Sequence, residues 1–237
     1  FISYIWIALP PATADNVRPE HRNKQPSAMW QQILHTDQQL LLALNGSWGG
    51  FWDTFFYIVT ARLTWIPLYA AILYFAWRRI GTRNLLWMLV CLGVAVIAAD
   101  QICNFFKHYT PKLRPSHTPA IEQFVHTLHG YRGGLYGTVS AHAAVSFTIA
   151  MFSARLFARS WYTWTIMLWA ALVCYSRIYA GLHYPLDILF GTALGLLLGT
   201  AAYRTYRKAT ALRPAKRAET APATSRETPK SLNDPNA

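Results

Sequence analysis

The stretch "SRIYAGLHYPLDILFGTALGLLLGT" (residues 176–200) places a polar turn directly before an apolar run. The turn carries an Arg, a His and an Asp, whereas the run from Ile188 has no charged residue before Arg204. A membrane-spanning helix needs about 20 predominantly apolar residues, so the run predicts a span over residues 185–203. A turn between two spans only has to reverse the direction of the chain and needs no charged residues. Charged residues that cluster in such a turn therefore indicate a functional site.

The composition of the whole chain indicates a membrane protein. Of its 237 residues, 53% are hydrophobic and only 14% are charged, which is unusual for a soluble domain. The predicted fold class is all-α, a polytopic membrane helix bundle of about five transmembrane helices. An N-terminal interfacial amphipathic helix is predicted over residues 29–46. The predicted spans are Phe55–Trp77, Asn84–Phe106, Ala141–Ala158, Trp161–Tyr175 with its flanks, and Pro185–Tyr203.

The two ends of the chain differ from the apolar middle. Residues 1–28 are interpreted as an extension upstream of Met29 or as a signal remnant, because Ala12-Thr13-Ala14 matches the small residues that end a signal peptide. Residues 29–209 form the predicted membrane-embedded domain, which holds all the apolar spans. From residue 210 to 237 small and polar residues replace the large apolar ones, which predicts a disordered basic cytoplasmic tail.

The distribution of positive charge predicts how the chain lies in the membrane. The net charge is +12, and the basic residues cluster at 78–83, 155–159 and 204–217, in alternate connections and after the last span. Under the positive-inside rule this predicts a multi-pass protein of the bacterial inner membrane with a cytoplasmic C-terminus. The expected partner is the bilayer, with no nucleic acid and no obligatory protein partner.

Three polar clusters interrupt the apolar pattern at the predicted periplasmic ends of the spans. They are "KHYTPKLRP" (107–115), "VSAHAA" (139–144) and the turn described above. Fixed cations suit the binding of phosphate, because guanidinium groups pair with its oxygens and lysine adds a point charge. The candidate phosphate-binding residues are Lys107, Arg114, Ser140 and Arg177, and the candidate catalytic residues are His183, His142 and Asp187.

His183 and Asp187 have the spacing of a base and the group that orients it. They are four residues apart, and Pro185 between them suits the first turn of a helix. Asp187 would then accept the Nδ1 proton of His183 and leave Nε2 free to attack phosphorus. His142 would serve as general acid to the leaving oxygen and then as base for water.

These motifs resemble the three signatures of the type-2 phosphatidic acid phosphatase superfamily, over residues 100–190. The second motif departs from the family's usual Pro-Ser-Gly-His, because this chain has Ala141 in place of the glycine, which adds a methyl group beside the phosphate. The matching motifs are Lys107-x6-Arg114-Pro115, Ser140-x-His142 and Ser176-Arg177-x5-His183-x3-Asp187.

The resemblance implies a phosphatase. Its activity is expected to be independent of metal, because the sequence shows no cluster of carboxylates of the kind that hard cations require, and no cofactor is expected. The resemblance also implies that His183 forms a phosphohistidine, that Asp187 orients it and that His142 protonates the leaving group. The four phosphate-binding candidates would hold the phosphate.

A second set of residues is predicted to support this site from within the spans. Arg62 and Asp100 are intramembrane charges, which normally face the bundle interior and pair with each other. Asp100, Asn104 and Lys107 follow the i, i+4, i+7 spacing of one helix face. Ala141 completes this set, as the residue that narrows the pocket.

The predicted function is hydrolysis of the terminal phosphate of a lipid phosphate or lipid pyrophosphate at the periplasmic face. Undecaprenyl pyrophosphate and lipid A phosphate are the favoured substrates. Phosphatidylglycerophosphate or phosphatidate phosphatase activity, and a lipid phosphotransferase with an acceptor other than water, are alternatives. An anion-binding channel or transporter is the alternative of another class, and it would need neither His142 nor His183.

Two further features carry simpler interpretations. The long connection from Lys107 to Ser140 is either a lid over the site or a flexible outer loop. Its histidines, His126 among them, are interpreted as loop residues without fixed partners. Gly191, Gly195 and Gly199 form a stripe of small residues that predicts a helix-packing surface.

Overall fold

The computed structural model describes residues 27–211, apart from the side chain of Arg62. The predicted N-terminal extension and cytoplasmic tail lie almost entirely outside this range, so the division into domains stays a prediction. In chain order the helices are α1 (Ala28–Leu44), α2 (Gly50–Thr60), the 3-10 helix η4 (Arg62–Trp65), α3 (Ile66–Tyr109), the 3-10 helices η5 (Pro115–His117), η6 (Glu122–Phe124) and η7 (Leu128–Gly130), α4 (Ala141–Phe157), α5 (Ser160–Tyr179) and α6 (Pro185–Ala211).

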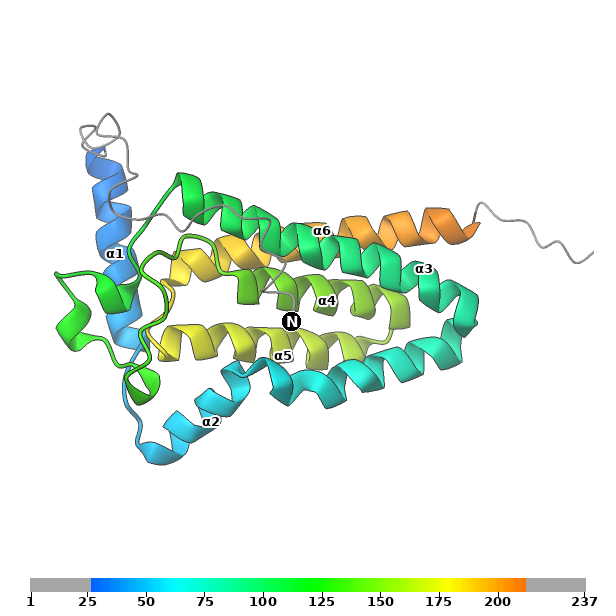
Figure 1. Cartoon of the computed structure of the whole chain (residues 1–237), viewed down its shortest axis with the longest axis horizontal. Coiled ribbons are helices and arrows are strands. Elements are labelled where there is room, and N and C mark those ends of the chain that lie inside the picture. The colour runs from blue at the N-terminus through cyan, green and yellow to red at the C-terminus, as the bar shows by residue number, and fades with distance from the viewer. Residues whose placement is uncertain (1–26, 212–237) are drawn as a thin grey trace, which may run out of the picture.

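The all-α prediction is confirmed. Within residues 27–211 there is no β-strand, and the one isolated β-bridge joins Leu113 to Tyr136. α3, α4, α5 and α6 run side by side as a bundle, and α1 lies across one end of it (Figure 1). The loop between α3 and α4 covers the same end.

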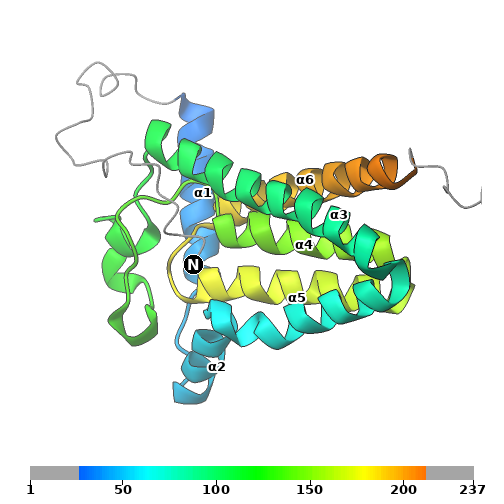
Figure 2. The same ribbon diagram turned by 45° about the vertical axis from the view of Figure 1, so that its right-hand side comes forward.

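α4 occupies the centre of the bundle, in contact with α3, α5 and α6 (Figure 2). Many of its buried residues are small, such as Ala143, Ala144 and Ala150, which have no exposed surface. Small side chains let neighbouring helices approach closely where lipid gives no hydrophobic drive for association. The sequence of α4 therefore suits a helix that is surrounded by others.

The outer surface of the bundle is apolar. Leu168, Leu197 and Val94 are each more than 60% exposed. Two stretches within the described residues, Leu63–Tyr109 and Pro185–Ala211, are long and apolar enough to cross a bilayer. These features agree with a protein embedded in a membrane, and the predicted number of spans stays a prediction.

The predicted helix Phe55–Trp77 is wrong as a continuous element. α2 ends at Thr60, Ala61 is extended (φ −74°, ψ 129°), and η4 intervenes before α3 begins at Ile66. The apolar composition of this segment gave no sign of the break.

Local polar contacts explain why the chain breaks there. Thr64 Oγ1 donates to the carbonyl of Ile58 (2.7 Å), and Trp65 Nε1 donates to the carbonyl of Val59 (2.8 Å). These bonds satisfy carbonyl groups that the end of a helix leaves without an intrahelical partner. Pro67 lacks an N–H group and fits the first turn of the next helix.

The reversal between the first two predicted spans is a sharp one. α3 turns back at Gly81, whose backbone (φ 74°, ψ 167°) divides it into helical halves 66–80 and 82–109 (Figure 1). A positive φ favours glycine, which has no Cβ to clash with the backbone. The remaining three predicted spans correspond to α4, α5 and α6, and α6 continues to Ala211.

The glycine stripe is a helix-packing surface, as predicted, and the helix that packs on it is α4. A Cβ on Gly191 would lie 2.9 Å from Ala143 Cβ, and a Cβ on Gly199 would lie 2.9 Å from Met151 Cβ. Gly195 lies between them and meets α4 at the carbonyl of Ala144. The stripe thus allows α6 to pack directly on the backbone of α4.

The loop over the end of the bundle is attached to α1 and α5. His126 N–H donates to Asn45 Oδ1 (2.7 Å), and Asn45 Nδ2 donates to the carbonyls of Ile178 (2.9 Å) and Tyr179 (2.8 Å). The His126 ring also pairs with Asp53 (Nε2 to Oδ1, 3.0 Å). The interpretation of His126 as a loop residue without a fixed partner is therefore wrong, because its partners lie far away in the sequence.

Candidate functional site

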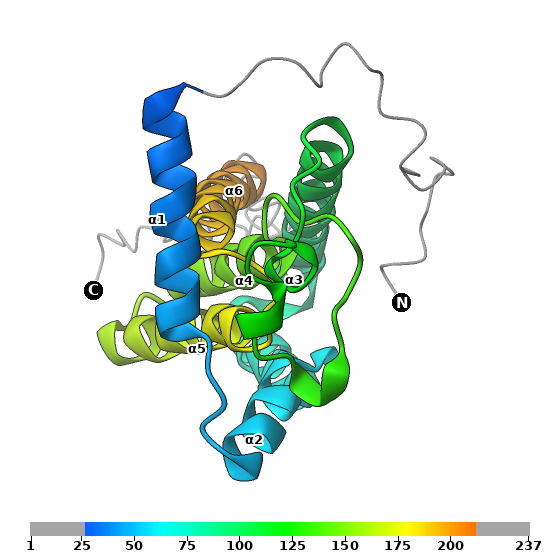
Figure 3. The ribbon, with the colours of Figure 1, turned by 90° about the vertical axis from the view of Figure 1, so that its left-hand side faces the viewer.

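The polar side chains of the three sequence clusters converge on one end of the bundle. α3 and α5 end there, and α4 and α6 begin there, beneath the loop over residues 110–140 (Figure 3). The N–H of Ser140 donates to the backbone carbonyl of Asp187 (3.1 Å), which joins the first turns of α4 and α6. The second and third motifs are thus in direct contact.

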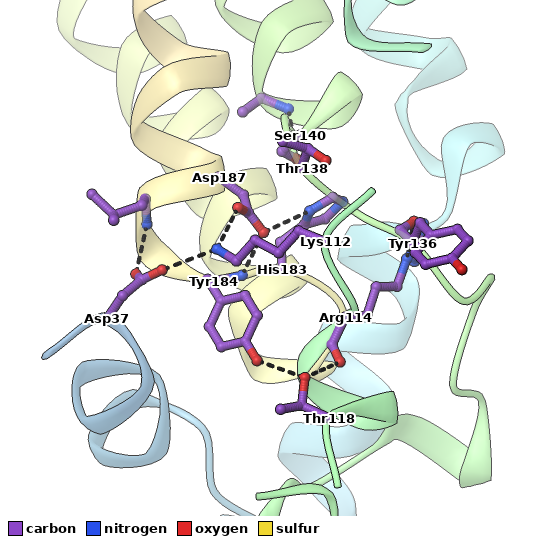
Figure 4. A network of polar contacts seen from close by, with 12 residues as sticks. Asp37, Lys112, Arg114, Thr118, Tyr136, Thr138, Ser140, His183, Tyr184 and Asp187 are labelled. Carbon is purple, nitrogen blue, oxygen red and sulfur yellow. Dashed lines mark hydrogen bonds and ion pairs between the residues drawn. The ribbon is translucent and has the colours of Figure 1, made fainter. Parts of the chain in front are cut away.

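His183 and Asp187 are both buried at this end, each about 2% exposed. His183 Nδ1 lies 3.5 Å from Asp187 Oδ2 (Figure 4). The distance is longer than a strong hydrogen bond, and Oδ2 accepts the N–H of Tyr184 at 3.0 Å. The predicted pair is therefore adjacent, and its hydrogen bond is not formed in this structure.

The pKa of His183 is well below that of an ordinary histidine. Burial is the main cause, because the protonated ring loses its hydration. The second cause is the positive charge of four neighbouring side chains, which are Arg177, Arg114, Lys107 and Lys112. The ring is therefore neutral, with a nitrogen lone pair available, at pH values where a free histidine is protonated.

Arg114 lies beside His183. Its Nε donates to the carbonyl of Tyr136 (3.1 Å), which fixes the guanidinium group within the loop. A Cβ on Gly137 would lie 3.0 Å from Arg114 Cγ and 3.4 Å from His183 Cε1. A side chain at position 137 would therefore crowd both Arg114 and His183, and the glycine leaves room for them.

Arg177 is held from a second direction. It lies in the last turn of α5, is 8% exposed, and its Nη1 donates to Thr60 Oγ1 (2.6 Å). Thr60 ends α2 and was not among the predicted site residues, because an isolated threonine in an apolar segment has no distinctive pattern. The contact ties α2 to the site.

Lys107 belongs to a polar face of α3. Lys107 Nζ donates to Asn104 Oδ1 (3.4 Å), and Asn104 Nδ2 donates to Asp100 Oδ2 (3.0 Å). The helical spacing of the three residues places them in this order along one face. The side chain of Arg62 lies outside the described structure, so its pairing with Asp100 stays a prediction.

Ser140 and His142 begin α4. Ser140 is the N-cap, and its buried Oγ accepts the N–H of Ala143 (3.5 Å). Ala141 and His142 follow in the first turn and are half-buried. The N-terminal end of a helix carries a partial positive charge, so this turn is suited to face an anion.

A cavity of about 490 Å³ adjoins His142. Its polar lining comes from Thr60, Asp100 and His142 near the site, together with Ser146. The rest of the lining is mainly apolar and aromatic, namely Val59, Trp65, Ile66, Tyr69, Val96, Ala141, Val145, Ile149 and Val173. The cavity therefore extends from the polar site into the apolar interior of the bundle.

Two further residues, Lys112 and Asp37, complete the site, and neither was predicted from the sequence. Lys112 Nζ bonds Asp187 Oδ1 (3.1 Å) and Asp37 Oδ2 (3.2 Å), and Asp37 comes from α1 (Figure 4). Lys112 lies within the first motif but at none of its signature positions. No three His, Cys, Asp or Glu side chains among the described residues are grouped so as to hold a metal ion.

Comparisons with known proteins connect this geometry to a family. The sequence model of the PAP2 superfamily matches residues 84–211. The lipid A 4′-phosphatase of Porphyromonas gingivalis is 39% identical over 177 residues, which cover 74% of this chain and 75% of that protein. The lipid A 4′-phosphatase of Bacteroides thetaiotaomicron is also 39% identical over 177 residues, covering 74% of this chain and 79% of that protein.

A solved structure has the same fold. It is the crystal structure of the first transmembrane PAP2 type phosphatidylglycerolphosphate phosphatase from Bacillus subtilis. It superposes with a TM-score of 0.56 at 20% sequence identity, over 77% of this chain and 90% of that chain. At this level of identity the likeness concerns the fold alone.

Proposed function

The chain belongs to the PAP2 superfamily, and from that premise we propose that it is a membrane phosphatase that hydrolyses the 4′-phosphate of lipid A. The family is the one that the three motifs predict. Of the two favoured substrates, lipid A phosphate is supported by two relatives that are each 39% identical and named lipid A 4′-phosphatases. The observation that carries the reaction is His183, buried, neutral and surrounded by cations.

In the proposed reaction His183 is the nucleophile. Its Nε2 lone pair forms a bond to phosphorus as the bond from phosphorus to the lipid oxygen breaks. His142 gives its proton to that oxygen, which leaves as the lipid hydroxyl. His142 then takes a proton from water, the water oxygen attacks phosphorus, and the N–P bond breaks to release inorganic phosphate and restore His183.

The phosphate is proposed to lie between His183 and the start of α4. Lys107, Arg114 and Arg177 would surround it with positive charge, and Ser140 would contact it from the N-terminal end of the helix. Fixed cations stabilise the negative charge of the transition state without having to reorganise.

We propose that this end of the bundle faces the periplasm. The basic connections around residues 78–83 and 155–159, and the end of α6, lie at the opposite end of the bundle (Figure 1). Positive residues mark the cytoplasmic side, so this distribution supports a periplasmic site and a cytoplasmic C-terminus.

Phosphate release from a panel of lipids tests the substrate. In detergent micelles, kcat/KM for lipid A carrying a 4′-phosphate should exceed that for undecaprenyl pyrophosphate, phosphatidylglycerophosphate and phosphatidate by at least about tenfold, or roughly 1.4 kcal/mol of transition-state binding. Mass spectrometry of the product identifies which phosphate leaves. Release from another lipid, with none from lipid A, would overturn the assignment.

The same assay separates hydrolysis from phosphotransfer. Hydrolysis predicts one free phosphate for each dephosphorylated lipid. A deficit of free phosphate, with a phosphorylated acceptor in its place, would favour the phosphotransferase. A channel or transporter would release no phosphate at all.

The cavity beside His142 predicts a difference between lipid and soluble substrates. Val145→Trp fills part of the cavity and should raise KM for the lipid by about tenfold, while turnover of p-nitrophenyl phosphate stays within about twofold. Steady-state kinetics on both substrates checks this. Val90→Trp, on the exposed face of α3, is the matched control and should change neither. An equal loss on both substrates for Val145→Trp would show that the cavity does not receive the lipid.

A further inference from the structure

Lys112 lies between two buried carboxylates. Its Nζ is 3.1 Å from Asp187 Oδ1 and 3.2 Å from Asp37 Oδ2 (Figure 4). The two carboxyl side chains are 2–3% exposed, whereas the lysine is 28% exposed. Two buried negative charges therefore share one cation that reaches them from the loop.

Each member of this cluster is fixed by a second contact. Asp37 Oδ1 accepts the N–H of Leu186 (2.9 Å), so α1 also binds the first turn of α6. Lys112 Nζ lies 4.1 Å from the centre of the Tyr184 ring, a distance that suits a cation–π contact. These contacts place the ammonium group in one position rather than leaving it free in solvent.

We propose that Lys112, held by Asp37 of α1, is a positioning residue that fixes the Asp187 carboxylate beside His183. This inference rests on the proposed function, because it assigns a role within the same reaction. It makes α1 part of the active site, although α1 precedes the residues matched by the family. None of the three motifs assigns a role to either Lys112 or Asp37.

The two oxygens of Asp187 are bound by different groups. Lys112 binds Oδ1 and the Tyr184 N–H binds Oδ2, which fixes the plane of the carboxylate with Oδ2 directed at His183 Nδ1. Without Lys112 the carboxylate loses one of these restraints. It also becomes a buried charge next to a second buried carboxylate, Asp37, with no cation between them.

Lys112 also affects the charge that His183 experiences. The charged groups around the ring are Lys107 of α3, Lys112 and Arg114 of the loop, Arg177 of α5 and Asp187 of α6, and α4 contributes the titratable His142. Removing Lys112 takes away one of the positive charges that lower the pKa of His183. The loss of that charge stabilises the protonated ring, so the pKa of His183 rises.

The experiment compares Lys112→Met with wild type over a range of pH, using lipid A phosphate and p-nitrophenyl phosphate. We expect kcat to fall by about 10- to 100-fold while KM stays within about threefold, because positioning acts on the transition state. The acidic limb of kcat/KM should move to higher pH, since a larger fraction of His183 is protonated. Lys112→Arg should recover most of the activity, and Lys208→Met is the matched control because Lys208 is exposed on α6.

Two results would overturn the inference. One is a Lys112→Met enzyme whose kcat stays within about threefold of wild type. The other is a loss of activity with the acidic limb unchanged, which is the behaviour of a merely structural residue. Thermal unfolding in detergent shows whether Lys112→Met is folded. If it is not, the double variant Asp37→Asn/Lys112→Met removes the repulsion between the Asp37 and Asp187 carboxylates. The inference then requires the same shift of the acidic limb in the double variant.

The design also separates this inference from the proposed function. A wild-type enzyme that hydrolyses p-nitrophenyl phosphate but none of the lipids overturns the proposed function, and Lys112 is then judged from the p-nitrophenyl phosphate profile. If wild type hydrolyses neither, NMR of 13C-labelled histidine reports the titration of His183, assigned with His183→Gln. A titration at higher pH in Lys112→Met supports the inference, and an unchanged titration rejects it.

Discussion

Replacing His183 with Gln is expected to lower kcat for phosphate release by at least about 10⁴-fold, because the reaction loses the nitrogen that attacks phosphorus. The His183 ring is buried and lies among four cations, and no other described side chain occupies that position. Glutamine fills a similar space and keeps a polar group beside Asp187. The measurement is single-turnover phosphate release from lipid A phosphate.

Two controls give this result its meaning. The melting temperature of His183→Gln in detergent should lie close to that of wild type, which shows that the fold is intact. Acid-labile phosphate should become attached to wild-type protein during turnover and should be absent from the variant. A variant that retains more than about a tenth of the wild-type rate would show that His183 is not the nucleophile.

Replacing Gly195 with Ala is expected to lower the free energy of unfolding by about 3 kcal/mol, or roughly 10 °C in melting temperature. The added Cβ would lie 2.8 Å from Phe147 Cβ and 3.1 Å from the Thr148 nitrogen, and it would also overlap the carbonyl of Ala144. Two of these neighbours are backbone atoms, so the helices have to move apart. Thermal unfolding in detergent measures the loss.

Gly93 provides the matched control for this substitution. It lies within α3, and a Cβ built on it would meet nothing within 4 Å. Gly93→Ala should therefore stabilise the helix by about 0.5–1 kcal/mol, because alanine restricts the unfolded chain more than glycine does. If both variants melted at the same temperature, direct packing of α6 on α4 would be wrong.

The loss of close packing should also reach the active site. α4 and α6 carry His142 and Asp187 in their first turns, joined by the bond from Ser140 N–H to the Asp187 carbonyl. A wider spacing at Gly195 would strain that bond. Misplacement of reacting groups lowers kcat more than KM, so the kinetic effect should appear in kcat.

The family and the helical class were evident from the sequence alone, and the candidate residues of the site come from the same motifs. The spacing of Lys107, Arg114, Ser140, Arg177 and His183 is a local property of motifs, and it needs no coordinates to be recognised. The position of Pro185 and the small-residue stripe from Gly191 to Gly199 were equally visible, because helix starts and close helix packing leave local patterns.

The distant residues that complete the site could be identified only from the folded chain. Asp37 and Lys112 are 75 positions apart in the chain, as are Lys112 and Asp187, and Thr60 is 117 positions from Arg177. An isolated Asp, Lys or Thr carries no periodic signal, so its partner is set only when the chain folds. The break after α2 could not be predicted for a related reason. Apolar composition predicts how long a buried or lipid-facing segment is. It cannot show where side chains replace the backbone hydrogen bonds of a helix.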